Sequence, residues 1–370
     1  MRGPPELDYA RLRTIPVDTR ANKVDSGQLA DRPRAGERAT FAAFYDSLPD
    51  LLVATDLRAL ARALAAAARG RGAGTDPGEP DEASPGGPVA RQSPEAATPA
   101  PSRPTPEMAT PASSRPTPEA GAVPCMMGGH VVKTGLSPVL IDLAERGVIT
   151  AFAANGSTAI HDYELARWGG TSEDVEAGLA DGSFGMAEET GRDINDAIRA
   201  AARDGLGLGE GLGRDLAERE DLAAAEHSLL LAARRLGIPF TVHAAIGAEI
   251  THQHPATDGA AIGEASFRDF RRLAAHLEGL EGGVVLNLGS AVMMPEVFLK
   301  ALTVCRNANG GKPRGFVAAD LDMIRHYRPR VNVVERPTRT GGGRGYQITG
   351  HHEIMVPLLA WAVVEELGRG

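Results

Sequence analysis

Glycine, polar and acidic residues gather in short clusters after residue 125, and each cluster follows an apolar run. The first cluster reads GGHVVKTG over 128–135. Glycines there let a ligand approach the backbone closely, and the helix expected next favours an anion such as a pyrophosphate at its N-terminus. The spacing matches neither G-x-G-x-x-G nor a P-loop. Two interpretations of this cluster remain: a tight strand-to-helix turn and a phosphate-binding loop.

The next two clusters combine hydroxyl and carboxyl groups. The run VITAFAA is followed by NGSTAIHD, in which Ser157 or Thr158 could bind a phosphate or a ribose. Asp162 is expected to cap the helix that starts there, and Glu164 adds a carboxylate for a pair of ribose hydroxyls. Glu188 and Glu189 follow GSFGMA. They suit either a cationic substrate or the acidic first turn of a helix.

Three histidines, His243, His252 and His254, lie within twelve residues and invite a zinc interpretation. His252 and His254 on an extended segment would point to opposite faces, and no cysteine or acidic ligand falls at zinc-finger spacing. We therefore expect a polar loop that lines a ligand pocket, and no metal. A last cluster, GHHE, contains His352 and places Glu353 in the first turn of the final expected helix.

Short apolar runs alternate with amphipathic segments of helical length from residue 125 onward. Strands alternating with helices predict βαβ units and a Rossmann-like, doubly wound, mainly parallel α/β sheet. Ligands of such folds bind beyond the carboxyl ends of the strands, where the clusters lie. The expected strands are 126–133, 148–154, 240–245, 283–288, 315–319, 331–334 and 346–349. The expected helices are 137–146, 162–168, 172–180, 194–204, 222–236, 267–277, 295–305 and 352–367.

The composition argues against several classes of protein. A net charge of −9 over 370 residues disfavours binding to nucleic acid and to an anionic membrane surface. No apolar stretch is long enough to span a membrane, and the first residues lack the apolar core of a secretory signal. Two cysteines exclude a disulfide scaffold and fit a reducing, cytoplasmic location.

The first third of the chain has two parts of different composition. Helical spacing of leucine and alanine predicts a helix over 38–69, within an N-terminal segment (1–69) that packs on the core. Residues 70–124 are rich in Pro, Ala and Thr and contain the tandem repeat ATPAPSRPTPEM and ATPASSRPTPEA. This composition predicts a disordered, extended linker. The remaining segment, 125–368, is expected to form the ligand-binding domain.

The segment GGHVVKTGLSPVLIDLAERGVITAFAANGSTAIHDYELA resembles the deoxyhypusine synthase family. HPATDGAAIG over 254–263 is similar to the family's P-A-x-T-D-G-S-x-G. GVVLNLGSAV is similar to its strand and glycine turn, and 354–360 to its closing helix. The first segment is also similar to archaeal-type ornithine cyclodeaminases, which carry G-N-A-x-A-V-H-D-I-E. Together these stretches cover roughly 125–367.

The resemblance implies a Rossmann-like NAD-binding fold, commonly assembled as a homotetramer with sites at subunit interfaces. It implies that His161, Asp162 and Glu164 lie beside the cofactor. The NAD pocket that it implies is lined by Gly128, Gly129, Lys133, Thr134, Gly135, Asn155, Gly156, Ser157, Glu188, Thr190, Asp258, Gly289, Ser290 and Ala291.

One departure from the family bears on activity. Deoxyhypusine synthases carry the butylamine group as an imine on the lysine of a W-G-K motif, whereas residues 331–350 here contain no lysine. Arginine cannot replace that nucleophile, because it stays protonated. The family's Lys-His pair after the glycine turn is also replaced, by Met294 and Pro295. The chain is therefore not expected to make deoxyhypusine.

We expect instead an NAD-dependent enzyme that acts on the C–N bond of a small cationic amine or amino acid. His161 or His243 is the candidate base, with Asp162 as the third catalytic candidate. The candidate substrate-binding residues are Glu164, Glu189, His254, His352 and Glu353. Two alternatives stay open: a cyclodeaminase-like lyase that uses NAD catalytically and releases ammonia, and a non-catalytic NAD-binding or structural protein.

Overall fold

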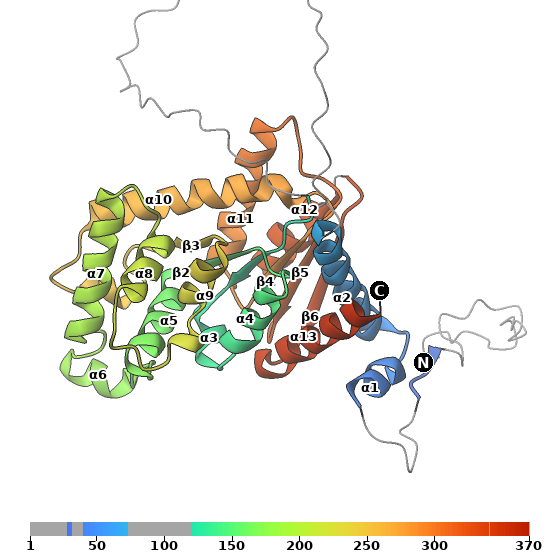
Figure 1. Ribbon diagram of the computed structural model, residues 1–370, viewed down its shortest axis with the longest axis horizontal. Coiled ribbons are helices and arrows are strands. Elements are labelled where there is room, and N and C mark those ends of the chain that lie inside the picture. The colour runs from blue at the N-terminus through green and yellow to red at the C-terminus, as the bar shows by residue number, and fades with distance from the viewer. Residues whose placement is uncertain (1–27, 32–39, 73–119, 340, 370) are drawn as a thin grey trace, which may run out of the picture.

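Six parallel strands form one sheet in the computed structural model, which describes residues 28–31, 40–72, 120–339 and 341–369 (Figure 1). The spatial order is β3-β2-β1-β4-β5-β6, and all neighbours run parallel. This is the order of a doubly wound Rossmann-like sheet, with its switch point between β1 and β4. The predicted fold class is confirmed. The strands are β1 (Pro124–Met127), β2 (Ala151–Asn155), β3 (Phe240–His243), β4 (Val284–Leu288), β5 (Val317–Asp322) and β6 (Arg344–Thr349).

The helices that follow β1 and β2 cover one face of the sheet. Alternate strand residues, such as Cys125 and Met127 of β1, face this layer, and Met126 between them faces the other. This alternation follows from the pleat of a strand buried on both sides. The layer contains α3 (Gly129–Lys133), α4 (Ser137–Glu145), α5 (Gly156–Trp168), α6 (Val175–Asp181), α7 (Glu188–Arg203), α8 (Leu208–Ala217), η4 (Ala225–His227) and α9 (Leu229–Leu236).

The opposite face is covered by the elements that connect β3 to β6. Met126, Val285 and Ala318 pack there against Phe298 and Phe316. Helix α10 contributes to both cores, since its first half packs with the first layer and its last turns with the second. The connecting elements are η5 (Ile250–Gln253), α10 (Gly259–His276), η6 (Leu277–Leu280), α11 (Met293–Ala308), the π-helix η7 (Pro329–Glu335) and α12 (Arg336–Arg339).

Two N-terminal helices, α1 (Phe41–Ser47) and α2 (Leu52–Gly72), lie beside the last helix, α13 (His352–Gly368) (Figure 1). Leu57, Leu60 and Leu64 of α2 belong to the same buried cluster as residues of α13. The Tyr45 hydroxyl donates to Glu366 Oε1 at 3.0 Å. The single helix expected over 38–69 is interrupted between α1 and α2, where Pro49 disfavours helical backbone in the preceding residue. Most of the expected linker, 73–119, lies outside the described residues.

The expected strand at 331–334 is wrong, because these residues belong to the π-helix η7. Its valines are buried against β5 and β6, so β-branched composition here reflects burial rather than a strand. The expected strand at 126–133 ends at Met127, and α3 begins at Gly129. The helix expected at 222–236 begins only at Leu229, while the one expected from 162 already starts at Gly156.

Helix α8 was not expected, because three glycines lower its intrinsic helix propensity. Packing explains two of them: a Cβ at Gly209 would overlap the carbonyl of Phe240, and one at Gly211 would overlap the Ala201 side chain. The helix therefore forms where only glycine allows its close approach to β3 and α7. None of the helices in the described segments combines the length and apolar character needed to cross a bilayer.

Candidate functional site

A cavity of about 220 Å³ lies beyond the carboxyl ends of β1 and β2, between α3, α5 and the loop that follows β3. Four residues singled out from the sequence line it: Lys133, Ser157, His161 and Glu164. Two further acidic residues, Glu173 and Glu249, complete its charged lining. The cavity thus lies at the edge of the sheet where α/β proteins bind their ligands.

His161 is held in one tautomer by a chain of hydrogen bonds. The Thr171 hydroxyl donates its single proton to Glu164 Oε2, so it accepts from His161 Nδ1, which lies 2.7 Å away. The Nε2 atom of the ring is therefore left as a proton acceptor. Burial, with a smaller effect of Lys133, lowers the pKa of His161 to about 4. The ring is neutral at pH 7.

The wall of the cavity carries a backbone outlier next to this chain. Ser172 has φ +72° and lines the cavity. A left-handed conformation costs a residue with a side chain about 1–2 kcal/mol, and such outliers cluster at functional sites. Thr190 adds a second contact to the same wall, where its hydroxyl donates to Glu164 Oε1 at 2.9 Å. The Glu164 carboxylate is thus fixed from two sides.

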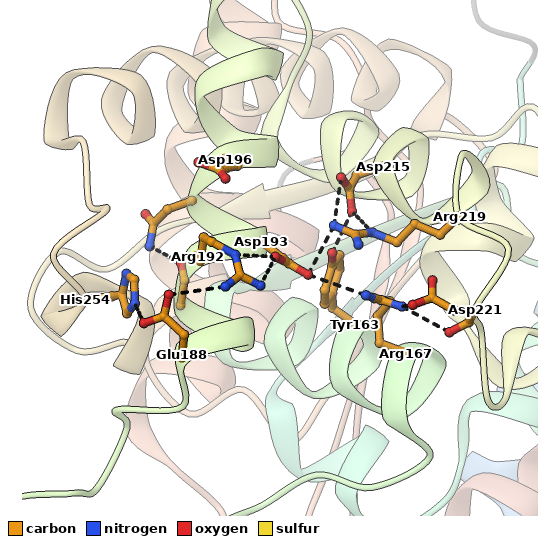
Figure 2. Close-up of polar contacts among 12 residues, drawn as sticks. Tyr163, Arg167, Glu188, Arg192, Asp193, Asp196, Asp215, Arg219, Asp221 and His254 are labelled. Atoms are coloured by element: carbon orange, nitrogen blue, oxygen red, sulfur yellow. Dashed lines mark hydrogen bonds and ion pairs between the residues drawn. The ribbon is translucent and has the colours of Figure 1, made fainter.

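A network of charges supports α5, the helix that carries His161 and Glu164 (Figure 2). Asp193 of α7 lies 3.6 Å from the Arg167 guanidinium and 3.2 Å from that of Arg219. Tyr163 donates to Asp215 of α8 at 2.6 Å. These contacts tie α5, α7 and α8 together.

The carboxylate of Glu249 occupies the start of α5. Its Oε1 atom accepts hydrogen bonds from the amides of Gly156, at 3.2 Å, and Ala245, at 2.8 Å. Its Oε2 atom lies 3.3 Å from His252 Nε2. Burial raises the pKa of Glu249.

Asp162 does not line this cavity. It is fully buried, and it accepts hydrogen bonds from Ser228 Oγ at 2.7 Å and from the amides of Leu229 and Leu230 at 2.7 and 3.0 Å. Asp162 therefore caps the start of α9, and the expectation that it caps its own helix is wrong. Asn155 is the N-cap of α5.

Several other predicted site residues lie elsewhere on the edge. His243, the last residue of β3, is buried, and burial lowers its pKa to about 3. It lines a separate cavity of about 260 Å³ near Phe267 and Phe270. His254 lies 3.2 Å from the Glu188 carboxylate (Figure 2). Both histidines therefore lie apart from the cavity beside His161.

Two more acidic candidates show no link to the cavity. Asp258 caps α10 by accepting from the amides of Ala260 and Ala261. Glu189 is exposed on the first turn of α7.

The glycine turns after β1 and β4 pack against each other at the switch point. A Cβ at Gly128 would lie 2.8 Å from the carbonyl oxygen of Gly289. Gly289 has φ +66°, and the buried ring of His352 covers it, donating from Nε2 to the carbonyl of Leu321 at 3.0 Å. Ser290 Oγ accepts from the amide of Met294 at 3.1 Å.

The remaining candidates flank these turns. The Thr134 hydroxyl donates to the carbonyl of His130 at 2.9 Å, and Gly135 has φ +77°. Gly129 lies against Ser157, whose hydroxyl a Cβ would overlap. Ala291 is half-buried and Glu353 is exposed.

Sequence reasoning missed Thr171, Ser172 and Glu249. Thr171 and Ser172 follow a Gly-Gly pair with no recognisable motif. Glu249 lies inside the histidine-rich loop that we expected to line a pocket, and it does line the cavity, although no motif distinguished it from its neighbours. Among the described residues, no group of three or more His, Cys, Asp or Glu side chains is arranged to hold a metal.

A larger cavity, of about 560 Å³, lies at the opposite, amino end of β3. Its walls include Leu230, Ile238 and Phe240, together with the ion pair between Arg272 and Glu210. It contains none of the residues singled out from the sequence. Parallel sheets bind ligands beyond the carboxyl ends of their strands. The smaller cavity beside His161 is therefore the better candidate for the ligand site.

NAD, the cofactor that the sequence motifs imply, does not fit the cavity beside His161 as it stands. The cavity is smaller than the roughly 300–1,000 Å³ of pockets for larger ligands. Asn155 and Asp258 cap helices, Thr190 binds Glu164, and the amide of Gly156 is already bonded to a carboxylate. Four of the groups expected to hold the cofactor are therefore used within the chain.

No protein-family model matches the chain, and no curated protein matches its sequence. Solved structures do match. A conserved putative LOR/SDH protein from Methanococcus maripaludis S2 is 20% identical at a TM-score of 0.40, with 68% of this chain and 63% of that one covered. A ternary complex of AgrE with ornithine and NAD+ is 17% identical at a TM-score of 0.39, with 67% and 30% covered.

A putative deoxyhypusine synthase from Entamoeba histolytica also matches. It is 11% identical at a TM-score of 0.40, with 70% of this chain and 79% of that one covered. The solved structures thus include a member of the family that the motifs resemble. The chain spans less than two thirds of the length of the LOR/SDH protein and of AgrE. TM-scores near 0.4 do not carry the function of these proteins over to this chain.

Proposed function

We propose that the chain is an enzyme that binds a small amine or amino-acid cation in the cavity beside His161 and acts at its C–N bond. The observation that carries the proposal is the chain of hydrogen bonds from Glu164 through Thr171 to His161. It leaves a neutral imidazole nitrogen as a proton acceptor in a cavity lined by carboxylates. A cationic amine supplies both the positive charge that the carboxylates favour and an N–H donor for the His161 acceptor nitrogen.

The lining gives the cavity a net negative charge. Glu164, Glu173 and Glu249 outnumber the single cation Lys133. An ammonium group is therefore favoured on the acidic side, and a carboxylate of an amino acid would find Lys133 and the Ser157 hydroxyl. His161 Nε2 would accept a hydrogen bond from the ammonium group while the imidazole stays neutral, because its pKa is lowered to about 4. The Glu164 carboxylate, acting through Thr171, would hold the ring in that orientation.

The motif resemblance implies NAD, through oxidation of the amine or catalytic use in ammonia release; because the cavity beside His161 does not fit the cofactor, the proposal routes no step through it. A homotetramer and a cytoplasmic location are further parts of the proposal that rest on the resemblance and on composition. A non-catalytic binding protein is the alternative that the missing lysine at 331–350 favours.

Calorimetric titration of the full chain with ornithine and with 1,4-diaminobutane tests the proposal. We expect saturable binding that weakens at least tenfold in Glu164→Gln and is unchanged in Asp142→Asn, whose exposed side chain lies on α4 outside the cavity. Turnover is then followed by ammonia release and by NADH absorbance, and His161→Gln should abolish it. Absence of binding by every amine tested would refute the proposal, while binding without turnover would favour the non-catalytic alternative.

A further inference from the structure

The carboxylate of Glu249 takes the place that a ligand's anionic group would take at the start of α5. Gly156 is the first residue of this 13-residue helix, and its amide is one of the donors that a helix leaves without an internal partner. Glu249 Oε1 accepts from that amide and from the amide of Ala245. The Glu249 side chain is only 7% exposed. Both oxygens of this buried carboxyl group are thus engaged within the chain.

Gly156 is needed for this contact, because a Cβ there would overlap the Glu249 carboxylate. The sequence motif assigns 155–157 to the NAD pocket, so the carboxylate stands where a phosphate of the cofactor would be expected. The Glu249 carboxylate and a phosphate cannot both take this position at the amide of Gly156. A phosphate would also meet the acidic lining of the cavity, in which Lys133 is outnumbered by three carboxylates.

We propose that Glu249 is the residue that sets the charge selectivity of this cavity: it excludes phosphate-bearing ligands, NAD included, and reserves the space for cations. This inference rests on the proposed function for the nature of the ligand, but not for the exclusion of phosphate. Entry of NAD would require the carboxylate to leave both amides and His252, its partner on the other side. The loop after β3, which carries Glu249, therefore determines which ligands the cavity accepts.

The test compares Glu249→Ala and Glu249→Gln with the wild-type chain, using calorimetry with inorganic phosphate, NAD and 1,4-diaminobutane as probes. We expect at least a tenfold gain in affinity for phosphate and NAD in Glu249→Ala, and about a tenfold loss for the diamine. Glu249→Gln keeps an acceptor oxygen for the two amides. Its gain in affinity for phosphate and NAD should therefore be smaller than that of Glu249→Ala. It also serves as the second variant if the alanine substitution unfolds the loop.

Glu173→Gln is the matched control. It removes one negative charge from the same cavity, where Glu173 accepts from the amide of Gly185 at 2.9 Å, and it leaves the Gly156 amide covered. An equal gain in this control, or unchanged phosphate and NAD affinities in both Glu249 variants, would overturn the inference. If the wild type binds no amine but Glu249→Ala gains phosphate, the proposed function fails and the selectivity role of Glu249 stands.

Discussion

Replacing Asp162 separates a structural role from a catalytic one. Its carboxylate satisfies the amides of Leu229 and Leu230 and the hydroxyl of Ser228, all of them buried. Asp162→Ala leaves two buried amides without an acceptor, at about 1–3 kcal/mol each. We expect a loss of about 2–6 kcal/mol, a large part of the roughly 5–15 kcal/mol that holds a typical domain together.

Urea unfolding followed by circular dichroism measures this loss as a lower midpoint at an unchanged slope. Asp162→Asn keeps one acceptor oxygen, so its urea midpoint should lie between those of the wild type and the alanine variant. The control is Asp142→Ala on α4, where an exposed pair with Arg146 at 2.7 Å is worth less than about 1 kcal/mol. A wild-type midpoint in Asp162→Ala would refute the capping role. Lost amine binding in a folded Asp162→Asn would instead point to a part in the site.

Three further predictions concern protonation and packing. His243 has a folded pKa of about 3 against about 6.5 in an unfolded chain, so its contribution to stability is complete above pH 6.5 and is lost as the pH falls. The free energy of unfolding from urea titrations should drop by up to about 1.4 kcal/mol per pH unit between pH 6 and 4, and His243→Gln should remove this share. Gly289→Ala adds a Cβ at φ +66°, 2.6 Å from the buried His352 ring, and should lower the free energy of unfolding by about 2–4 kcal/mol. Lys133→Ala should raise the pKa of His161 in an NMR titration, because Lys133 is one cause of its lowering; an unchanged value would leave burial as the whole cause.

Much of the sheet and part of the site could be predicted because they depend on local pattern. Apolar runs between helical segments predicted all six strands, with one further strand expected wrongly at 331–334, and the clusters after β1 and β2 supplied Lys133, Ser157, His161 and Glu164. These residues come from consecutive strand ends, so the parallel topology alone brings them together.

What could not be predicted depends on contacts between distant segments. Asp162 caps a helix that begins 67 residues later, and Glu249 reaches an amide 93 residues earlier. No local spacing encodes such pairs. The valines of η7 follow the composition of a strand while their backbone is helical, since burial selects the same side chains in both.

The packing of α2 on α13 has a consequence for synthesis of the chain on the ribosome. Leu60 and Leu64 leave the ribosome early, whereas Val356 and Leu359, members of the same buried cluster, follow roughly 290 residues later. At about 5–20 residues per second, the apolar face of α2 waits for roughly 15–60 s before its partner helix exists. Docking of α13 thus completes the burial of this face, and until then α2 presents a surface on which chaperones can act.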